Sequence, residues 1–434
     1  MLILLRKIFI SMKIKIRKKK VMKKPEILAP AGNFEKLRSA VAFGADAVYL
    51  AGVSFGMRSA AGNFTAEEIP LAVKYCHERG VKIYITVNTM PRTGEYPRLE
   101  QHLRMLSEAG VDALIISDLG VFMTAKEVVP EMTLHISTQA SVVSARTCTE
   151  WYKLGASRVI LARELTLEEI IEIRAQIPKE LELEAFVHGS MCVAYSGRCL
   201  LSNYITGRDA NRGACAQPCR WEYKIAELEE VKREGERLVM IEEGGDTFTF
   251  SSRDLCMIEH IPDLVRSGLS CLKIEGRMKS ACYVGAVTNA YRMAIDSYFS
   301  DPEGYTFDPK WLDELESVCH RQYATGFFYG ETMDTANICD SPGYIKEQAA
   351  LGVCLGYDSE RGLALFMQKN KFSLGERVEL LVPGKTAIAF TPDKIYGEDG
   401  AEIESTPHPM MRFSLPVPFP VPEQAILRYA KAGD

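Results

Sequence analysis

An alternation of short β-branched runs with helical stretches limits the fold of this chain more than any other feature. Residues 33–43, 66–79 and 95–109 place apolar side chains at a period near 3.6, as helices do. Because strands that alternate with helices form parallel sheets, the pattern predicts an α/β fold, a TIM-type (β/α)8 barrel. The expected strands are Ile27–Ala29, Ala47–Leu50, Lys82–Val87, Ala113–Ser117, Leu134–Ser137, Arg158–Ala162, Leu183–Val187 and Cys271–Ile274.

Composition shifts divide the chain. We expect the barrel domain at 25–335, with a cysteine-rich insertion at 189–251 that contains a polar hairpin near Glu242–Asp246. From 341 to 430, short strands, turns and prolines predict a small all-β C-terminal barrel. Residues 1–24 contain ten Lys or Arg and no acid. We expect this extension to be disordered, or to result from a start placed too far upstream of Met22.

Charge and hydropathy exclude some classes of function. The net charge of −5 argues against a pure nucleic-acid-binding module. It does not exclude an enzyme that binds nucleic acid through a local basic surface. No apolar run reaches the length of a membrane span, and the N-terminal apolar residues are too few for a signal peptide. We therefore expect a cytoplasmic protein.

Four of the twelve cysteines lie in loop-like sequence rich in Gly, Ser, Asn and Arg: Cys192, Cys199, Cys215 and Cys219. Without a secretory signal, disulfides are disfavoured, and buried free thiols account better for the cysteines in apolar patterns. The four loop cysteines are predicted to be ligands of one centre. A zinc knuckle fits only Cys215 and Cys219, so the irregular spacing modestly favours an iron–sulfur cluster over zinc. Cys256 is a reserve ligand.

Polar residues follow nearly every expected strand, where barrel enzymes carry their reactive groups. They are Asn88, Asp118, Gln139, Arg163, Glu164, His188, Glu275 and Arg277. We predict that His188 and Glu275 are catalytic, with a structural, hydrogen-bonded His188 as the alternative. Arg163, Arg198, Arg277 and Lys279 are predicted to bind an anionic substrate, because guanidinium groups pair with carboxylate or phosphate.

The run from Glu184 through His188-Gly189-Ser190 to Cys192, Cys199 and Ser202 resembles the signature of the collagenase-like peptidase U32 family. Residues 26–34, 44–49, 204–221 and 272–280 continue the resemblance, which covers about 25–430. It is closest to the branch that helps to form 5-hydroxyuridine at the wobble position of tRNA. That branch implies prephenate as a required metabolite. Relatives in another pathway imply a 4Fe–4S cluster, here on Cys192, Cys199 and Cys215 with Cys219 as the fourth ligand.

Protease chemistry is not evident in the motifs. His77-Glu78 lacks a second histidine one turn later, and there is no G-x-S-x-G sequence. Gly384-Lys385-Thr386 resembles the end of a P-loop, but Glu379 replaces its first glycine.

Three functional hypotheses follow. The first is a redox enzyme that hydroxylates tRNA uridine with an iron–sulfur cluster. The second is a U32 peptidase, with zinc as the alternative metal. The third is a non-catalytic RNA-binding or assembly partner. The expected partners are tRNA and a small dicarboxylate, with an accessory protein or a second copy of the chain as further candidates.

Overall fold

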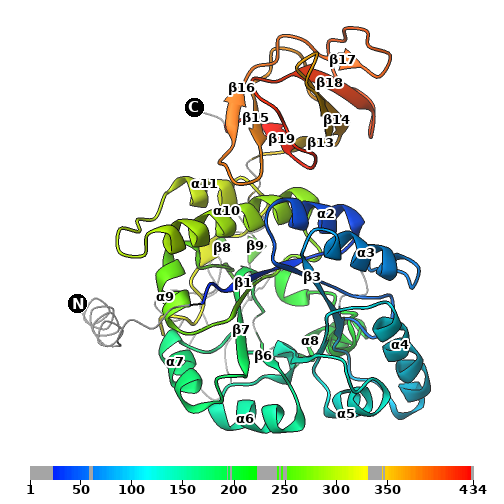
Figure 1. Cartoon of the computed structure of the whole chain (residues 1–434), viewed down its shortest axis with the longest axis vertical. Coiled ribbons are helices and arrows are strands. Elements are labelled where there is room, and N and C mark those ends of the chain that lie inside the picture. The colour runs from blue at the N-terminus through cyan, green and yellow to red at the C-terminus, as the bar shows by residue number, and fades with distance from the viewer. Residues whose placement is uncertain are drawn as a thin grey trace.

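The computed structural model describes residues 23–57, 62–192, 194–195, 198–221, 242–243, 246–247, 252–330, 345 and 348–431. Eight parallel strands form a closed barrel surrounded by helices (Figure 1), which confirms the predicted fold class. They follow chain order and close where β11 pairs with both β7 and β1. These strands are β1 Glu26–Pro30, β2 Ala47–Leu50, β3 Lys82–Val87, β4 Ala113–Ile116, β5 Leu134–Ile136, β6 Arg158–Ile160, β7 Glu182–Ser190 and β11 Cys271–Ile274.

The barrel helices are α2 Phe34–Ala42, α3 Glu68–His77, α4 Tyr96–Glu108, α5 Leu119–Val128, α6 Ala145–Leu154, α7 Leu167–Gln176, α9 Ile261–Arg266 and α10 Ala281–Ser300. Five of the barrel helices, α2, α5, α6, α7 and α10, begin at a residue whose side chain caps the helix. Asn33 accepts a hydrogen bond from the backbone N–H of Lys36, and Thr166 and Glu169 form a capping box. Gly155 ends a helix in the left-handed conformation, at φ 108°. None of the described helices is long and apolar enough to span a membrane.

Two short strands extend the sheet beyond the barrel and were not predicted. β10 (Asp254–Cys256) pairs antiparallel with the end of β7, and β12 (Tyr323–Ala324) pairs parallel with β10. The described parts of the insertion contain α8 (Leu201–Thr206) and the β8–β9 hairpin (Glu242–Glu243 and Asp246–Thr247), which confirms the expected hairpin. Residues 1–22 and most of 222–251 lie outside the described residues.

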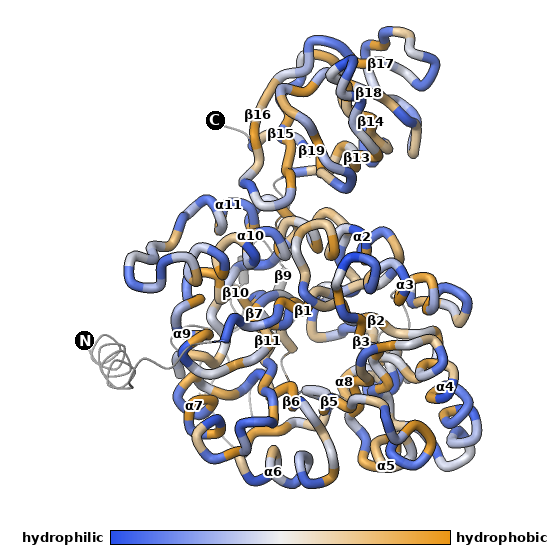
Figure 2. The backbone as a smooth tube through the Cα atoms, viewed as in Figure 1, coloured by the Kyte–Doolittle hydropathy of each residue, from blue (hydrophilic) through white to orange (hydrophobic). Residues whose placement is uncertain are grey.

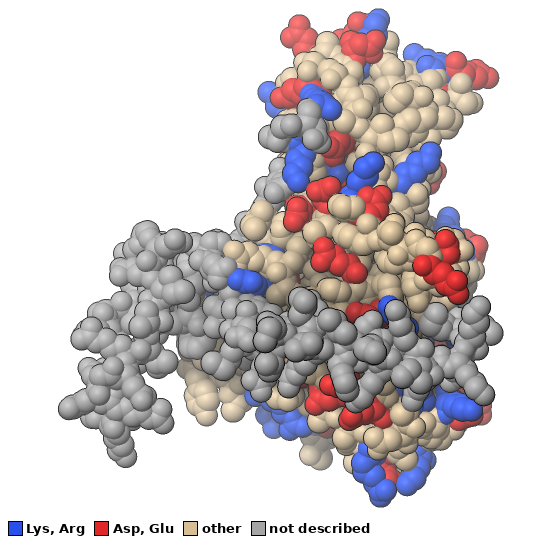
Figure 3. Space-filling view, turned by 90° about the vertical axis from the view of Figure 1, so that its left-hand side faces the viewer, with Lys and Arg blue, Asp and Glu red and all other residues tan. Residues whose placement is uncertain are grey.

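The C-terminal region forms one seven-stranded antiparallel sheet in the order β16-β15-β19-β13-β14-β18-β17. Its strands are β13 Ala350–Asp358, β14 Leu363–Gln368, β15 Val378–Leu381, β16 Ile388–Phe390, β17 Tyr396–Gly397, β18 Arg412–Pro416 and β19 Ile426–Tyr429. It has its own apolar core, which includes Phe366, Phe372 and Phe413. Apolar stretches follow its central strands and those of the barrel (Figure 2). On the face shown in Figure 3, acidic and basic side chains are mixed over this region.

A buried ion cluster joins the C-terminal sheet to the barrel. Arg428 on β19 is 4 % exposed. Its guanidinium contacts Glu314 on α11 (Lys310–Glu316) at 2.8 Å and Glu379 on β15 at 2.9 Å, and donates to the Ser317 hydroxyl at 2.6 Å. Because the two carboxylates come from different domains, this one cation pairs with a carboxylate on each side of the junction.

A second polar contact lies nearby. The side chain of Asn289 on α10, fully buried, accepts from the backbone N–H of Gly384 at 2.8 Å and donates to the carbonyl of Lys385 at 2.8 Å. The segment that resembled the end of a P-loop is therefore a contact between domains.

Replacing Arg428 with Met is expected to destabilise the protein by about 3–5 kcal/mol, because Glu314 and Glu379 would stay buried without their cation. Urea unfolding followed by circular dichroism measures this change. Lys369→Met is the matched control, because Lys369 also joins the domains, at 2.6 Å from Glu35, but in a more exposed pair. It should cost at most about 1 kcal/mol. Equal losses in the two variants would contradict the assignment.

Candidate active site at the barrel mouth

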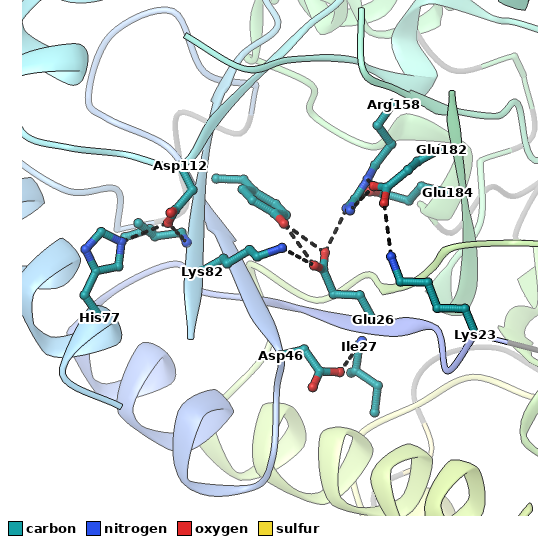
Figure 4. A network of polar contacts seen from close by, with 12 residues as sticks. Lys23, Glu26, Ile27, Asp46, His77, Lys82, Asp112, Arg158, Glu182 and Glu184 are labelled. Atoms are coloured by element: carbon teal, nitrogen blue, oxygen red, sulfur yellow. Dashed lines mark hydrogen bonds and ion pairs between the residues drawn. The ribbon is translucent and has the colours of Figure 1, made fainter. Parts of the chain in front are cut away.

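Charged side chains near the amino ends of several barrel strands form a network of ion pairs (Figure 4). Arg158, 4 % exposed at its side chain, contacts Glu26 at 2.8 Å, Glu182 at 2.6 Å and Glu184 at 3.2 Å. Burial alone would raise the pKa of Glu26, but the charge of Arg158 and its hydrogen bond outweigh it and lower the pKa. These residues lie at the amino ends of β1, β6 and β7, where polar groups in such barrels support stability rather than catalysis. Sequence reasoning missed this network.

The middle of the barrel carries a buried lysine. Lys273 on β11 lies 2.9 Å from Glu184. Its ammonium group also lies 4.4 Å from the ring centroid of Tyr49 and 5.2 Å from that of Phe186. The aromatic rings and the carboxylate therefore hold the lysine from different directions.

Two predicted substrate-binding arginines, which follow β6 and β11, lie at the carboxyl ends of the barrel strands, which we call the mouth. Arg163 stands 5.2 Å above the Phe186 ring and donates to the Ser190 carbonyl at 3.0 Å. Arg277, 4 % exposed, donates to Thr86 at 3.3 Å and to Asn63 at 2.7 Å. The structure thus brings two guanidinium groups to the barrel mouth in defined orientations.

Glu275 stands at the mouth, directly after β11 and two residues before Arg277. Its backbone N–H donates to the His188 carbonyl at 2.8 Å, and its own carbonyl accepts from Tyr283 at 3.1 Å. Gly189 adopts φ +105°, and a Cβ there would lie 2.6 Å from the Glu275 carbonyl oxygen, so only glycine fits. Among the described residues, no hydrogen bond is recorded for the half-buried Glu275 carboxylate.

His188 occupies an aromatic enclosure instead of lining the mouth beside the arginines. A register shift between β7 and β11 places it opposite Ile274. Its ring centroid lies within 5.9 Å of those of Tyr283, Tyr291 and Tyr323. Neither ring nitrogen has a hydrogen-bond partner in the described part of the chain. Burial lowers the pKa of His188 to about 3, so the ring is neutral at physiological pH. Its predicted proton-transfer role stays a prediction.

Lys279 contacts β10 and the segment before β12, and its predicted role in substrate binding stays a prediction. Its ammonium group donates to the Cys319 carbonyl at 2.8 Å and lies 4.0 Å from Asp254. Asp254 also forms a 2.7 Å ion pair with Arg321, and both are almost fully buried. Sequence reasoning did not find this pair, because the two residues are far apart in the chain.

Other polar strand-end residues have local roles. Asp118 caps α5, and the Asn88 amide oxygen accepts from the backbone N–H of Met57. Burial raises the pKa of Glu164. The buried Gln139 amide oxygen has no partner within the described residues.

The cysteine loop, residues 191–221, is fastened across the strand ends. Arg212 donates to the Met90 carbonyl at 2.7 Å and forms a bidentate pair with Glu95, at 2.9 and 3.0 Å. Arg220 donates to the Met191 carbonyl at 3.4 Å. These contacts tie the loop to the segments that follow β3 and β7. Arg198, by contrast, is exposed on the loop.

The other three loop cysteines lie close enough to Cys219 to influence its pKa. Burial raises the pKa of Cys219, Arg220 opposes this, and charge on Cys192, Cys215 and Cys199 raises it further. The backbone N–H of Gln217 donates to the Cys215 sulfur at 3.4 Å. No group of three or more His, Cys, Asp or Glu residues in the described ranges is arranged to hold a single metal ion.

Cys256, the reserve ligand, is in a different place. It lies on β10, where burial raises its pKa to about 12 and the Tyr291 hydroxyl is its hydrogen-bonding neighbour.

Comparison with known proteins identifies the family. The model of the family described as "Peptidase family U32" matches residues 32–337, and the model described as "Peptidase family U32 C-terminal domain" matches residues 346–428. This chain belongs to peptidase family U32.

Relatives within the U32 family have two kinds of name. The chain is 39 % identical over 403 residues to "tRNA hydroxylation protein P1" of Bacillus subtilis, covering 91 % of this chain and 92 % of the relative. It is 37 % identical over 434 residues to "tRNA hydroxylation protein P" of Escherichia coli, covering 92 % and 94 %. A protein of Porphyromonas gingivalis named "Collagenase" is 29 % identical, over 94 % and 98 %.

The Arg212–Glu95 pair should fasten the loop in a pH-dependent way. The Arg212 hydrogen bond lowers the pKa of Glu95 from 4.5 to about 2. The clamp is therefore complete above pH 4.5 and is lost as the pH falls toward 2. Hydrogen exchange of residues 201–213, corrected for intrinsic rates, should rise over this interval.

Glu95→Gln should show the faster exchange already at neutral pH. Glu100→Gln is the control, because Glu100 is an exposed position on α4, the helix that follows Glu95 directly. Unchanged exchange in Glu95→Gln would contradict the clamp.

Proposed function

We propose that this chain is a tRNA-modifying redox enzyme that forms 5-hydroxyuridine at the wobble position. The observation that carries the proposal is a loop with four cysteines that Arg212 and Arg220 fasten to the segments after β3 and β7, next to the mouth arginines Arg163 and Arg277. Full-length relatives named as tRNA hydroxylation proteins supply the reaction class.

The proposed cofactor is a 4Fe–4S cluster on Cys192, Cys199, Cys215 and Cys219. Four thiolates around one zinc would stand about 4 Å apart, since each Zn–S bond is about 2.3 Å. The proposal of a cluster rests on the irregular spacing of the four cysteines, because an iron–sulfur centre is larger than a zinc ion and tolerates such spacing better. The N–H donated to the Cys215 sulfur suits a thiolate ligand. When bound, such a cluster supplies one-electron transfer.

The proposed co-substrate is a dicarboxylate of the prephenate type. Arg163 and Arg277 are held by contacts that keep their guanidinium groups at the mouth. Such preorganised guanidinium groups bind carboxylates bidentately and lose little side-chain entropy in doing so. Arg198, exposed on the cysteine loop, is placed to contact the RNA or the outer part of the metabolite.

Glu275 is the better candidate for proton transfer. Its backbone is fixed on both sides, by His188 and Tyr283, while its carboxylate lies half-buried at the mouth. The neutral, enclosed ring of His188 supports a role in shaping this strand end.

The alternative is a peptidase, which the family description and the collagenase relative favour. A thiol protease would need a histidine beside its cysteine. Cys192 is exposed, whereas the His188 ring is enclosed by tyrosines and makes no hydrogen bond in the described chain. The geometry therefore gives this alternative less support.

Cys219→Ser should lose the cluster, whereas Cys256→Ser should retain it, because Cys256 lies apart in the sheet. Iron and sulfide analysis of anaerobically purified protein, with the visible absorption spectrum, measures the difference. Full iron content in Cys219→Ser, or its loss in Cys256→Ser alone, would overturn the ligand set.

Deletion of the gene should remove 5-hydroxyuridine and its derivatives from tRNA. Wild type should restore them and Cys192→Ala should not, as measured by mass spectrometry of tRNA nucleosides. Arg277→Lys should restore less than wild type, because lysine cannot reproduce the fork of contacts. Unchanged nucleosides in a strain without a second hydroxylating enzyme would refute the proposal, and peptide cleavage would then be assayed.

A further inference from the structure

Exposed aromatic side chains are concentrated in the cysteine loop. The chain has 18 Tyr, 18 Phe and 3 Trp. Within the described residues, the only aromatic ones among the exposed large hydrophobic side chains are Tyr195, Tyr204 and Trp221, at 48 %, 83 % and 40 % exposure. All three lie in residues 191–221, and none packs against either apolar core. Leu200 and Ile205 beside them are also exposed. Folding does not account for so much exposed apolar area in one loop.

The same loop is locally basic. Residues 191–221 contain four arginines and one aspartate, a balance of +3 in a chain whose net charge is −5. Arg198 and Arg208 are exposed between the aromatic residues. Arg208 is oriented by its Nε, which donates to the Ala214 carbonyl at 2.9 Å. Rings that alternate with cations match single-stranded nucleic acid, because each unpaired base offers a face for stacking and each nucleotide carries a phosphate.

The loop is also in a fixed place. Ser202, fully buried, donates to the Arg208 carbonyl at 2.9 Å and accepts from the backbone N–H of Ala216 at 3.0 Å. Together with the clamp from Arg212 to Glu95, these bonds hold α8 beside the ends of the barrel strands. Tyr204 therefore projects from an ordered surface.

We infer that Tyr195, Tyr204 and Trp221, with Arg198 and Arg208, form a stacking platform for unpaired nucleotides of the tRNA anticodon loop. The inference rests on the proposed function for the identity of the RNA. The rings stack on bases that flank the target uridine and the arginines contact phosphates, so that the target base reaches the mouth. Paired RNA, whose bases are already stacked, does not fit this surface.

The test measures binding of the full-length, cluster-loaded protein to an anticodon stem-loop RNA and to a fully paired hairpin of equal length. Tyr204→Ala should weaken stem-loop binding about 5- to 100-fold, the range for loss of one stacked base. Tyr204→Phe, which keeps the ring, should bind within about twofold of wild type. Met410→Ala, 58 % exposed in the C-terminal domain, is the matched control. Iron content and the circular dichroism spectrum report whether each variant is folded.

Three results would overturn the platform. The first is wild-type affinity in folded Tyr204→Ala. The second is an equal loss of affinity for the paired hairpin. The third is a Tyr204→Ala variant that retains RNA affinity and loses binding of an accessory protein, which would make the surface a protein interface.

The nucleoside assay separates this inference from the proposed function. If deletion of the gene leaves the 5-hydroxyuridine content of tRNA unchanged while Tyr204→Ala still weakens stem-loop binding, the platform stands and the hydroxylation proposal falls. If hydroxylation requires the protein but Tyr204→Ala binds RNA and supports hydroxylation as wild type does, the hydroxylation proposal stands and the platform falls.

Discussion

The pairing of β7 with β11 is the contact on which the rest of the structure depends. It closes the barrel, and its register shift lets the end of β7 continue into an antiparallel pairing with β10. One strand therefore carries Glu184 in the barrel interior and Gly189 at the mouth, and the cysteine loop begins directly after it. Since Gly189 lies against the Glu275 backbone, the first cysteine is positioned by the same contact that closes the barrel.

The charged interior makes this closure specific. Glu184 stands between Arg158 and Lys273, which come from strands on either side of β7. A one-residue slip of β7 would turn Glu184 outward and leave two cations buried without their shared partner. A barrel with an apolar interior would tolerate such a slip more easily, because the slip would only exchange one apolar side chain for another and would leave no charge unpaired. In this barrel, ion pairs thus supply a register restraint at the end opposite the candidate site.

The sequence pattern predicted all eight barrel strands, because each is a short, largely apolar run and all but β7 lead into a helix of regular period. It missed β10 and β12, because both pair outside the strand–helix alternation: β10 runs antiparallel to the end of β7, and β12 pairs with β10. The position of His188 also depended on information that no local pattern contains, namely the register shift opposite Ile274. The contacts of Lys279 with the buried Asp254 and the Cys319 carbonyl likewise depend on long-range pairing that its place after a strand does not predict. Residue type and strand-end position thus predicted which segments form the mouth, but long-range pairing decided where each side chain points.

Helix α10 connects the mouth with the C-terminal sheet. It begins at Ala281, just after Arg277 and Lys279, and its Tyr283 hydroxyl binds the Glu275 carbonyl. Two turns later, Asn289 binds the loop at Gly384 and Lys385. Because these residues are buried and lie on one continuous helix, the C-terminal sheet cannot move relative to Glu275 without breaking hydrogen bonds inside the protein. A large substrate such as the proposed tRNA would therefore meet the mouth and the C-terminal sheet at a fixed separation. Such a frame lets contacts far from the reacting base contribute to its positioning.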